Sequence, residues 1–187
     1  MLKIKKYMAA LAFLFAPVAA EAAPDLTLLD QENLLMLQLT TGMVAIEMRP
    51  DKAPNHVARI KELVGDGFYD GLTFHRVIDG FMAQTGDPNG DGTGGSGQRL
   101  EEEFNSLRLI RGRAAMAREA EDENSADSQF FIMLNTRRLM DRYTAWGRVV
   151  DGMRAVDNIK KGNPNYDGRV MSYPDKIIKA WIAADQQ

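Results

Sequence analysis

The sequence predicts a mainly β domain in which eight short strands form a closed antiparallel β-barrel, with only two α-helices. Short apolar runs separated by turn residues recur along the chain, which is typical of antiparallel sheets. Apolar residues at helical spacing occur in just two segments. Closure is favoured because a closed sheet has no exposed edge strands. The 187 residues fit one domain with a core of its own.

The first predicted elements are a hairpin and a helix. Residues 34–39 and 43–48 are apolar runs on either side of a Thr-Thr-Gly turn, so we expect two paired strands. Pro54 suits the first position of a helix, and Gly65 ends the run that follows it. The apolar residues between them recur at helical spacing: Val57, Ile60, Leu63 and Val64.

The next two strands are expected at residues 72–77 and 81–85, joined by a short turn. Successive side chains of a strand point to opposite faces of a sheet. This alternation predicts that Phe74 and Arg76 lie on one face and that His75 lies on the other.

The second half of the chain begins with a glycine-rich stretch, residues 86–97, which we expect to be an ordered surface loop. A second helix is predicted from Asp151, as the N-cap, to Gly162. Its buried residues would be Met153, Val156 and Ile159. The remaining strands are expected at 113–117, 129–134, 144–149 and 176–182.

The segment from Phe74 to Asp87 reads F-H-R-V-I-D-G-F-M-A-Q-T-G-D. It resembles the active-site segment of cyclophilin-type peptidyl-prolyl isomerases, in which F-H-R, a three-residue spacer, G-F-M, one variable residue and Q-x-G-D run together. The likeness continues through 116–117, 128–132 and 139–147, and covers nearly everything from Leu34 to Ile182. The residues predict the strands, and the resemblance supplies their closure: it implies a closed eight-stranded barrel capped by a helix at each end, with a substrate groove on its outer wall.

An arginine beside an apolar pocket suits catalysis of peptide-bond rotation. The barrier is ~18–20 kcal/mol because the amide must give up its C–N double-bond character. In the twisted state the prolyl nitrogen regains a lone pair, so a hydrogen-bond donor stabilises that state more than the planar one. We therefore predict Arg76 as the catalytic donor, and Gln84 as the group that holds the carbonyl before proline.

Recognition of proline requires an apolar socket of the size of its ring. The resemblance implies that Phe131 is the pocket floor, whereas Phe130 points inward, and that Ala117 and Gln129 line the groove beside the pocket. The predicted substrate-binding residues are Phe81, Met82, Ala117, Gln129, Phe131, Leu139 and Tyr143.

Three departures, four residues in all, separate this sequence from the best-known eukaryotic members of the family. Arg138 stands where those members have a tryptophan, so cyclosporin binding is in doubt because the indole donor is absent. Tyr143 replaces a pocket histidine and retains an aromatic wall with a polar tip. Arg118 and Glu119 replace smaller residues, as in the bacterial branch of the family, and would border the subsite before proline.

The N-terminus is typical of an exported protein. Three lysines precede a 14-residue apolar run, residues 7–20, and Ala20-Glu21-Ala22 forms an A-x-A cleavage site. The alternative, a membrane anchor, would need ~20 apolar residues. We expect a signal peptide at 1–22, a short arm at 23–33 and the isomerase domain at 34–187. The bacterial character favours the periplasm over the extracellular medium.

Charge and cysteine content exclude several classes of function. Removal of the signal leaves 20 basic and 25 acidic residues, a net charge of −5, which disfavours nucleic-acid binding. The chain has no cysteine, which excludes disulfides, thiol catalysis and lipid attachment at a cysteine.

Residues 87–92 read D-x-N-x-D-G, the opening of a calcium loop, but position twelve is Gln98 instead of glutamate. A glycine pattern at 90–95 lacks the strand and helix of a dinucleotide site. His56, expected on an exposed helix face, and His75, expected to be packed and hydrogen-bonded, are the only histidines. We therefore expect no metal and no cofactor.

The sequence thus predicts a monomeric peptidyl-prolyl cis-trans isomerase that acts on proline-containing, unfolded or partly folded polypeptides during folding of exported proteins. Uncatalysed X-Pro isomerisation takes tens to hundreds of seconds and can limit folding. The alternative from another class is a proline-recognising binding module or chaperone with little turnover. Glu119, Arg138 and Tyr143 are the positions that keep this alternative open.

Overall fold

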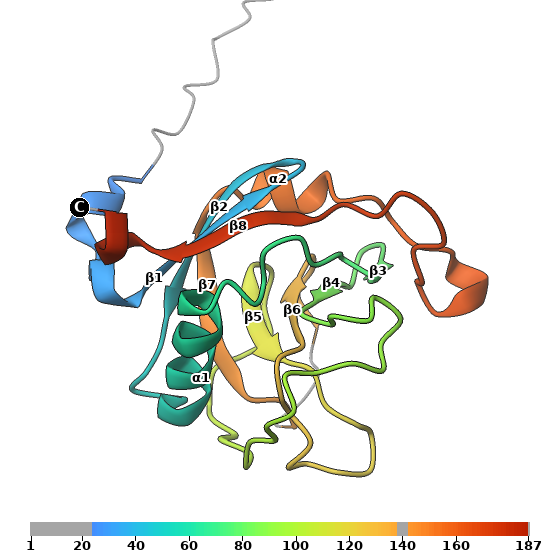
Figure 1. Cartoon of the computed structure of the whole chain (residues 1–187), viewed down its shortest axis with the longest axis horizontal. Helices are drawn as coiled ribbons and strands as arrows, with labels where there is room; N and C mark the ends of the chain where they lie inside the picture. The colour runs from blue at the N-terminus through green and yellow to red at the C-terminus, as the bar shows by residue number, and fades with distance from the viewer. Residues whose placement is uncertain (1–23, 138–141, 187) are drawn as a thin grey trace, which may run out of the picture.

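The computed structural model describes residues 24–137 and 142–186. Its main feature is one antiparallel sheet of eight strands, which curls into a half-barrel in the order β3-β4-β6-β5-β7-β2-β1-β8 (Figure 1). The strands are β1 (Leu34–Leu39), β2 (Gly42–Met48), β3 (Arg76–Ile78), β4 (Met82–Thr85), β5 (Arg113–Met116), β6 (Phe130–Met133), β7 (Ala145–Asp151) and β8 (Ile177–Ile182).

The prediction of a closed barrel is wrong, because the sheet is open between β3 and β8. The segment before β3 meets the start of β8 only through one isolated bridge in the described part of the chain, Thr73 with Lys176, and a few backbone hydrogen bonds, such as that from the amide of Phe74 to the carbonyl of Asp175 at 2.9 Å. The free edge of β3 is instead covered by the segment 162–170. The amide of Val77 donates to the carbonyl of Gly168 at 2.8 Å, and the amide of Gly162 donates to the carbonyl of Val77 at 2.9 Å.

The strand predicted at 72–77 is consequently shorter, and its expected alternation is wrong. Residues 74 and 75 precede β3, so they do not follow the pleat of the strand. Phe74 is fully buried in the main core, whereas His75 and Arg76 both line a pocket on the outer face.

The main core fills the concave side of the sheet. Tyr69, Phe130 and Trp146 form a chain of edge-to-face ring contacts, with centroids 5.5 and 5.4 Å apart. A second, smaller cluster lies on the convex side of strands β4 to β7. It contains Met82, Leu109, Ala115, Phe131, Met133 and Ala145. Neighbouring residues of one strand, such as Phe130 and Phe131, therefore belong to different cores.

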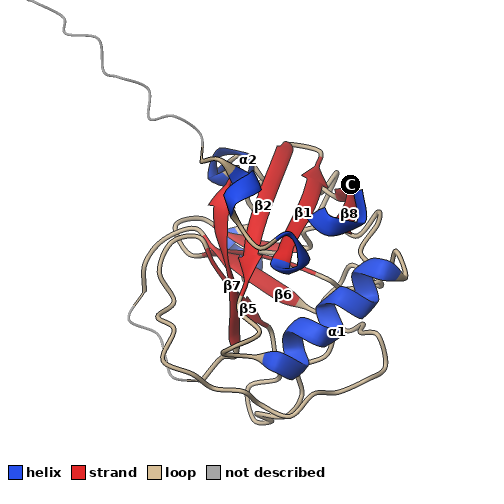
Figure 2. Cartoon of the chain, turned by 90° about the vertical axis from the view of Figure 1, so that its left-hand side faces the viewer, coloured by secondary structure: helices blue, strands red, loops and turns tan. Residues whose placement is uncertain are grey.

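Helix α1 (Pro54–Gly65) crosses one end of the half-barrel (Figure 2). Its N-cap, Ala53, provides no side-chain acceptor, and Glu103 replaces it from a distant loop. The carboxylate of Glu103 accepts hydrogen bonds from the amides of Asn55 and His56, at 3.0 and 3.1 Å, and contacts Nδ1 of His56 at 2.7 Å. His56 is 0% exposed, so its expected exposure is wrong.

Helix α2 (Met153–Asp157) is shorter than predicted and begins elsewhere. Asp151 is not the N-cap, because it is the last residue of β7 and pairs with Ala45 of β2. Gly152 is the N-cap, with φ at +82°, where a Cβ atom would overlap the carbonyl oxygen of Met43. No helix within residues 24–137 and 142–186 has the length and apolar character needed to span a bilayer.

We expect the protein to lose stability as the pH falls from about 7.5 to about 5.5, before most carboxylates titrate. Burial lowers the pKa of His56 and of His75 below the ordinary value of 6.5. The unfolded chain then binds more protons than the folded one, so stability is complete above the ordinary histidine pKa and is lost as the pH falls through it. Urea unfolding at both pH values measures this difference. Equal free energies of unfolding would contradict burial of neutral histidines.

Candidate active site

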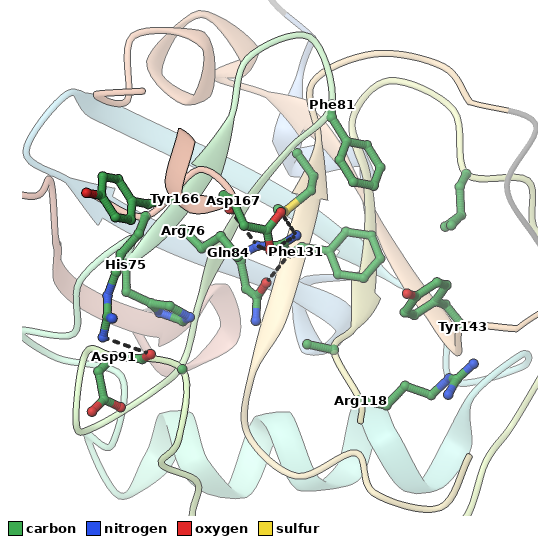
Figure 3. A pocket seen from close by; sticks show the side chains of 15 residues that line it. His75, Arg76, Phe81, Gln84, Asp91, Arg118, Phe131, Tyr143, Tyr166 and Asp167 are labelled. Atoms are coloured by element: carbon green, nitrogen blue, oxygen red, sulfur yellow. Dashed lines mark hydrogen bonds and ion pairs between the residues drawn. The ribbon is translucent and has the colours of Figure 1, made fainter. Parts of the chain in front are cut away.

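A pocket of about 370 Å³ opens on the convex face of the sheet, above the second cluster (Figure 3). Its lining combines an apolar floor with a polar wall. The residues are His75, Arg76, Phe81, Met82, Gln84, Asp91, Gly92, Leu109, Ala117, Arg118, Phe131, Tyr143, Tyr166, Asp167 and Arg169.

The floor is made of side chains that the strands hold rigidly. Phe131 and Met82 project from β6 and β4 and are only 6% and 2% exposed. The ring of Tyr143 meets that of Phe131 edge to face, with centroids 5.3 Å apart. The floor is therefore a rigid apolar surface that suits a small ring. Of the predicted pocket residues, Leu139 lies outside the described part of the chain, and Leu109 was not anticipated.

The polar wall begins with Arg76 and Gln84, which lie directly opposite each other on β3 and β4. Nη1 of Arg76 donates to Oε1 of Gln84 at 3.0 Å. Nε2 of Gln84 donates in turn to Oε1 of Gln129 at 2.9 Å, and Nε2 of Gln129 donates to the carbonyl of Gly94 at 2.8 Å. This chain of hydrogen bonds fixes the guanidinium at the edge of the apolar floor.

A second, more polar groove adjoins the pocket and shares Gln84 and Ala117 with it. Gln129 lies in this groove and not in the pocket itself, as the sequence predicted. Arg118 and Glu119 border the groove, and the Arg118 guanidinium lies over the ring of Tyr143 at 5.3 Å. The structure thus brings together every described residue of the predicted site, while the roles assigned to these residues stay predictions.

Besides Leu109, the lining residues not predicted from the sequence include Asp91, Tyr166, Asp167 and Arg169. Asp167 contacts Arg76 directly, with Nε to Oδ2 at 3.1 Å and Nη2 to Oδ1 at 3.0 Å. The two residues are 91 positions apart in the chain. No local pattern could have predicted this contact, because only the loop that covers the edge of β3 creates it.

His75 is not hydrogen-bonded as expected, because neither ring nitrogen has a partner among the described residues. It is 4% exposed and reaches the pocket lining. Burial lowers the pKa of His75, and the negative charge of the nearby Asp87 offsets part of this decrease. The ring is therefore neutral at pH 7 and adds no positive charge to those of the pocket arginines.

The D-x-N-x-D-G segment is organised by hydrogen bonds within its own loop. The carboxylate of Asp87 accepts from the amides of Asn89, Asp91, Gly92 and Gly94 at 2.5 to 3.0 Å. Within residues 24–137 and 142–186, no three His, Asp or Glu side chains gather as metal ligands would. Asp87 thus holds the glycine-rich loop against the site.

The curled antiparallel sheet thus carries an apolar pocket on its convex face, with the paired Arg76 and Gln84 at its edge, and this arrangement suits a small ring that accepts hydrogen bonds. The family model described as cyclophilin type peptidyl-prolyl cis-trans isomerase/CLD matches residues 34–181. The chain therefore belongs to the cyclophilin-type peptidyl-prolyl cis-trans isomerase family, as its motifs predicted.

Individual relatives agree. A probable peptidyl-prolyl cis-trans isomerase of Brucella suis is 48% identical over 195 residues, 97% of each chain. Peptidyl-prolyl cis-trans isomerase B of Bacillus subtilis is 39% identical over 130 residues, 68% of this chain and 90% of that protein. The prediction that the chain is an isomerase is confirmed.

Solved structures support the fold. A cyclophilin from Hirschia baltica superimposes with a TM-score of 0.74 at 27% identity, over 84% of this chain and 76% of that one. A cyclophilin-type isomerase from Cryptosporidium parvum, crystallised in the presence of the dipeptide Ala-Pro, gives 0.72 at 25% identity, over 80% of this chain and 98% of that one. The mainly β, cyclophilin-like fold is confirmed.

Substitution of Phe131, in the pocket, and of Phe130, in the main core, separates an effect on binding from an effect on stability. Phe131→Ala should weaken binding of an Ala-Pro peptide about tenfold or more, since ~1.5–3 kcal/mol of apolar burial is lost. Phe130→Ala should instead cost ~3–5 kcal/mol of stability. NMR titration of the peptide and urea unfolding measure the two effects. Unchanged affinity in Phe131→Ala would contradict its place as the floor.

Proposed function

We propose that the pocket binds the proline ring of an X-Pro segment and that Arg76 catalyses rotation about the X-Pro bond. The observation that carries this proposal is the guanidinium fixed at the rim of the apolar floor. Nη1 has two hydrogens and donates one to Gln84, which leaves a donor for a ligand in the pocket. The Ala-Pro dipeptide of the Cryptosporidium parvum crystal supports a proline-containing substrate for this chain as well.

The proposed mechanism is a difference in hydrogen bonding between two states of the substrate. In the planar amide the nitrogen lone pair is delocalised, so Arg76 gains little from it. In the twisted state the lone pair is localised, and a donor at the pocket rim binds it more tightly. The apolar floor strengthens this interaction because it lowers the effective dielectric on one side of the guanidinium.

Gln84 has a second role in the proposal. Its Oε1 accepts from Arg76 and its Nε2 donates to Gln129. The second hydrogen on Nε2 is available for the carbonyl oxygen of the residue before proline. The substrate would then be held at its carbonyl while the prolyl ring stays in the pocket and the bond between them turns.

The proposed setting is the folding of exported proteins after removal of residues 1–22. The A-x-A pattern and the basic, apolar start of the chain support export, and the periplasm fits the identity with bacterial relatives. Clients would be unfolded or partly folded chains, because an extended segment would lie along the open groove on the convex surface. The domain would act as a monomer, with no cofactor.

Replacement of Arg76 tests the catalytic assignment. Arg76→Ala should lower kcat/KM for an Ala-Pro peptide by about 10²-fold or more, as loss of a transition-state donor does. Peptide affinity should change little, because the apolar floor is intact. The matched control is Arg169→Ala, which removes another arginine of the same pocket. Full activity in Arg76→Ala would remove this residue from the mechanism.

Export has its own test. The full chain, expressed in a Gram-negative host, should yield a periplasmic protein whose first residue is Ala23, as determined by mass spectrometry. Ala22→Arg should block processing, because the cleavage site requires a small residue there. Recovery of an unprocessed chain in the cytoplasm would contradict export.

A further inference from the structure

Arg76 has a partner on the side away from Gln84. The carboxylate of Asp167 receives Nε at 3.1 Å and Nη2 at 3.0 Å, and the backbone carbonyl of Asp167 also accepts from Nε at 3.0 Å. Figure 3 shows the carboxylate and the guanidinium facing each other beside Gln84. A two-pronged contact of this kind sets the plane of the guanidinium as well as its position.

Some N–H groups of Arg76 bind neighbouring residues, and the others are free to bind a ligand. The guanidinium has five N–H groups. Nε and one hydrogen of Nη2 are directed to Asp167, and one hydrogen of Nη1 is directed to Gln84. The two remaining hydrogens lie in the plane that these contacts define. Without the Asp167 carboxylate, the contacts that remain among the described residues are those of the Arg76 guanidinium with the Asp167 backbone carbonyl and with Gln84.

The backbone places Asp167 firmly against the strand that carries Arg76. Asp167 follows the turn Pro164–Tyr166 with φ at +51°, a left-handed conformation that Asp, Asn and Gly tolerate best. The next residue, Gly168, makes two backbone hydrogen bonds. Its amide donates to the carbonyl of Asn163 at 3.0 Å, and its carbonyl accepts from the amide of Val77 at 2.8 Å. The loop and β3 therefore form one rigid unit.

The ion pair contributes little to the stability of the fold. The side chain of Asp167 is 77% exposed and that of Arg76 is 32% exposed. Exposed pairs between such groups have small effects on folding. The geometry is instead suited to orientation, since Asp167 lines the pocket beside the proposed donor.

We propose that Asp167 is a positioning residue, which holds the Arg76 guanidinium in the plane that presents its free donors to the X-Pro bond. This inference rests on the proposed role of Arg76 and extends it to a residue of the 162–170 loop. In this role the carboxylate acts on the X-Pro bond through Arg76 and not directly.

The test removes the carboxylate without disturbing the backbone. Asp167→Asn and Asp167→Gly both tolerate the left-handed conformation and leave one and no side-chain acceptors. We expect about tenfold slower catalysed exchange of an Ala-Pro peptide in Asp167→Gly, with an intermediate value in Asp167→Asn, because misplacement of a catalytic group lowers the rate steeply. The peptide dissociation constant should stay within about twofold, since the apolar floor is unchanged.

A matched control is Asp51→Asn, which breaks another exposed two-pronged pair, with Arg49, away from the pocket. This variant should keep the wild-type exchange rate. The second readout is the NMR signal of the Arg76 side chain. Rotation about its Nε–Cζ bond should be slow in the wild type and fast in Asp167→Gly, whereas a structural role alone would leave it unchanged.

The outcomes separate this inference from the proposed function. Slower exchange together with faster guanidinium rotation supports the positioning role. Unchanged or faster exchange, or slower exchange with unaltered rotation, overturns it while Arg76 keeps its assignment. Full activity in Arg76→Ala overturns the proposed function itself, whatever the Asp167 variants show.

Discussion

Antiparallel pairing of β3, β4 and β6 is the constraint on which the site depends. Arg76 lies opposite Gln84, Gln84 lies opposite Phe131, and Phe131 lies opposite Ala115 of β5. Residues directly opposite on neighbouring strands share one face of the sheet. The register therefore forms a single row across the convex face, from a donor, through an amide, to an aromatic floor.

Alternation along each strand separates this row from the main core. Ala83 and Ile132 are the sequence neighbours of Gln84 and Phe131 in this row. Their side chains point to the concave side of the sheet and are 0% exposed. A slip of one residue in β4 would exchange Gln84 for a core residue and bury the amide. The same register thus stabilises the fold and assembles the pocket, which explains how a rigid site is built without a disulfide.

The opening between β3 and β8 also has a consequence for the site. Because the segment 162–170 covers the free edge of β3, it can deliver Tyr166, Asp167 and Arg169 to the pocket rim. A barrel closed by β8 would have a strand at this place. The half-barrel therefore extends the polar wall beyond Arg76 and Gln84, which the paired strands supply.

Local patterns predicted what local forces determine. Short apolar runs between turn residues located the strands apart from the start of β3, and the F-H-R to Q-T-G-D segment located Arg76 and Gln84. Long-range contacts decided the remainder. The local sequence predicts Asp151 as an N-cap, but Asp151 pairs with Ala45 in the β2–β7 ladder. It also predicts His56 on an exposed helix face, but Glu103 contacts and covers this side chain. Asp167 carries no signal of its own, since its partner is 91 residues away.

The most direct test of the account is two-dimensional exchange NMR on an Ala-Pro peptide with substoichiometric wild-type protein, which reports binding and interconversion in one sample. If the Arg76 pocket catalyses rotation, cis–trans exchange peaks should grow with protein concentration. The interconversion should be far faster than the uncatalysed process, which takes tens to hundreds of seconds. Peptide signals that shift on binding without faster exchange would contradict this account and identify a proline-binding module.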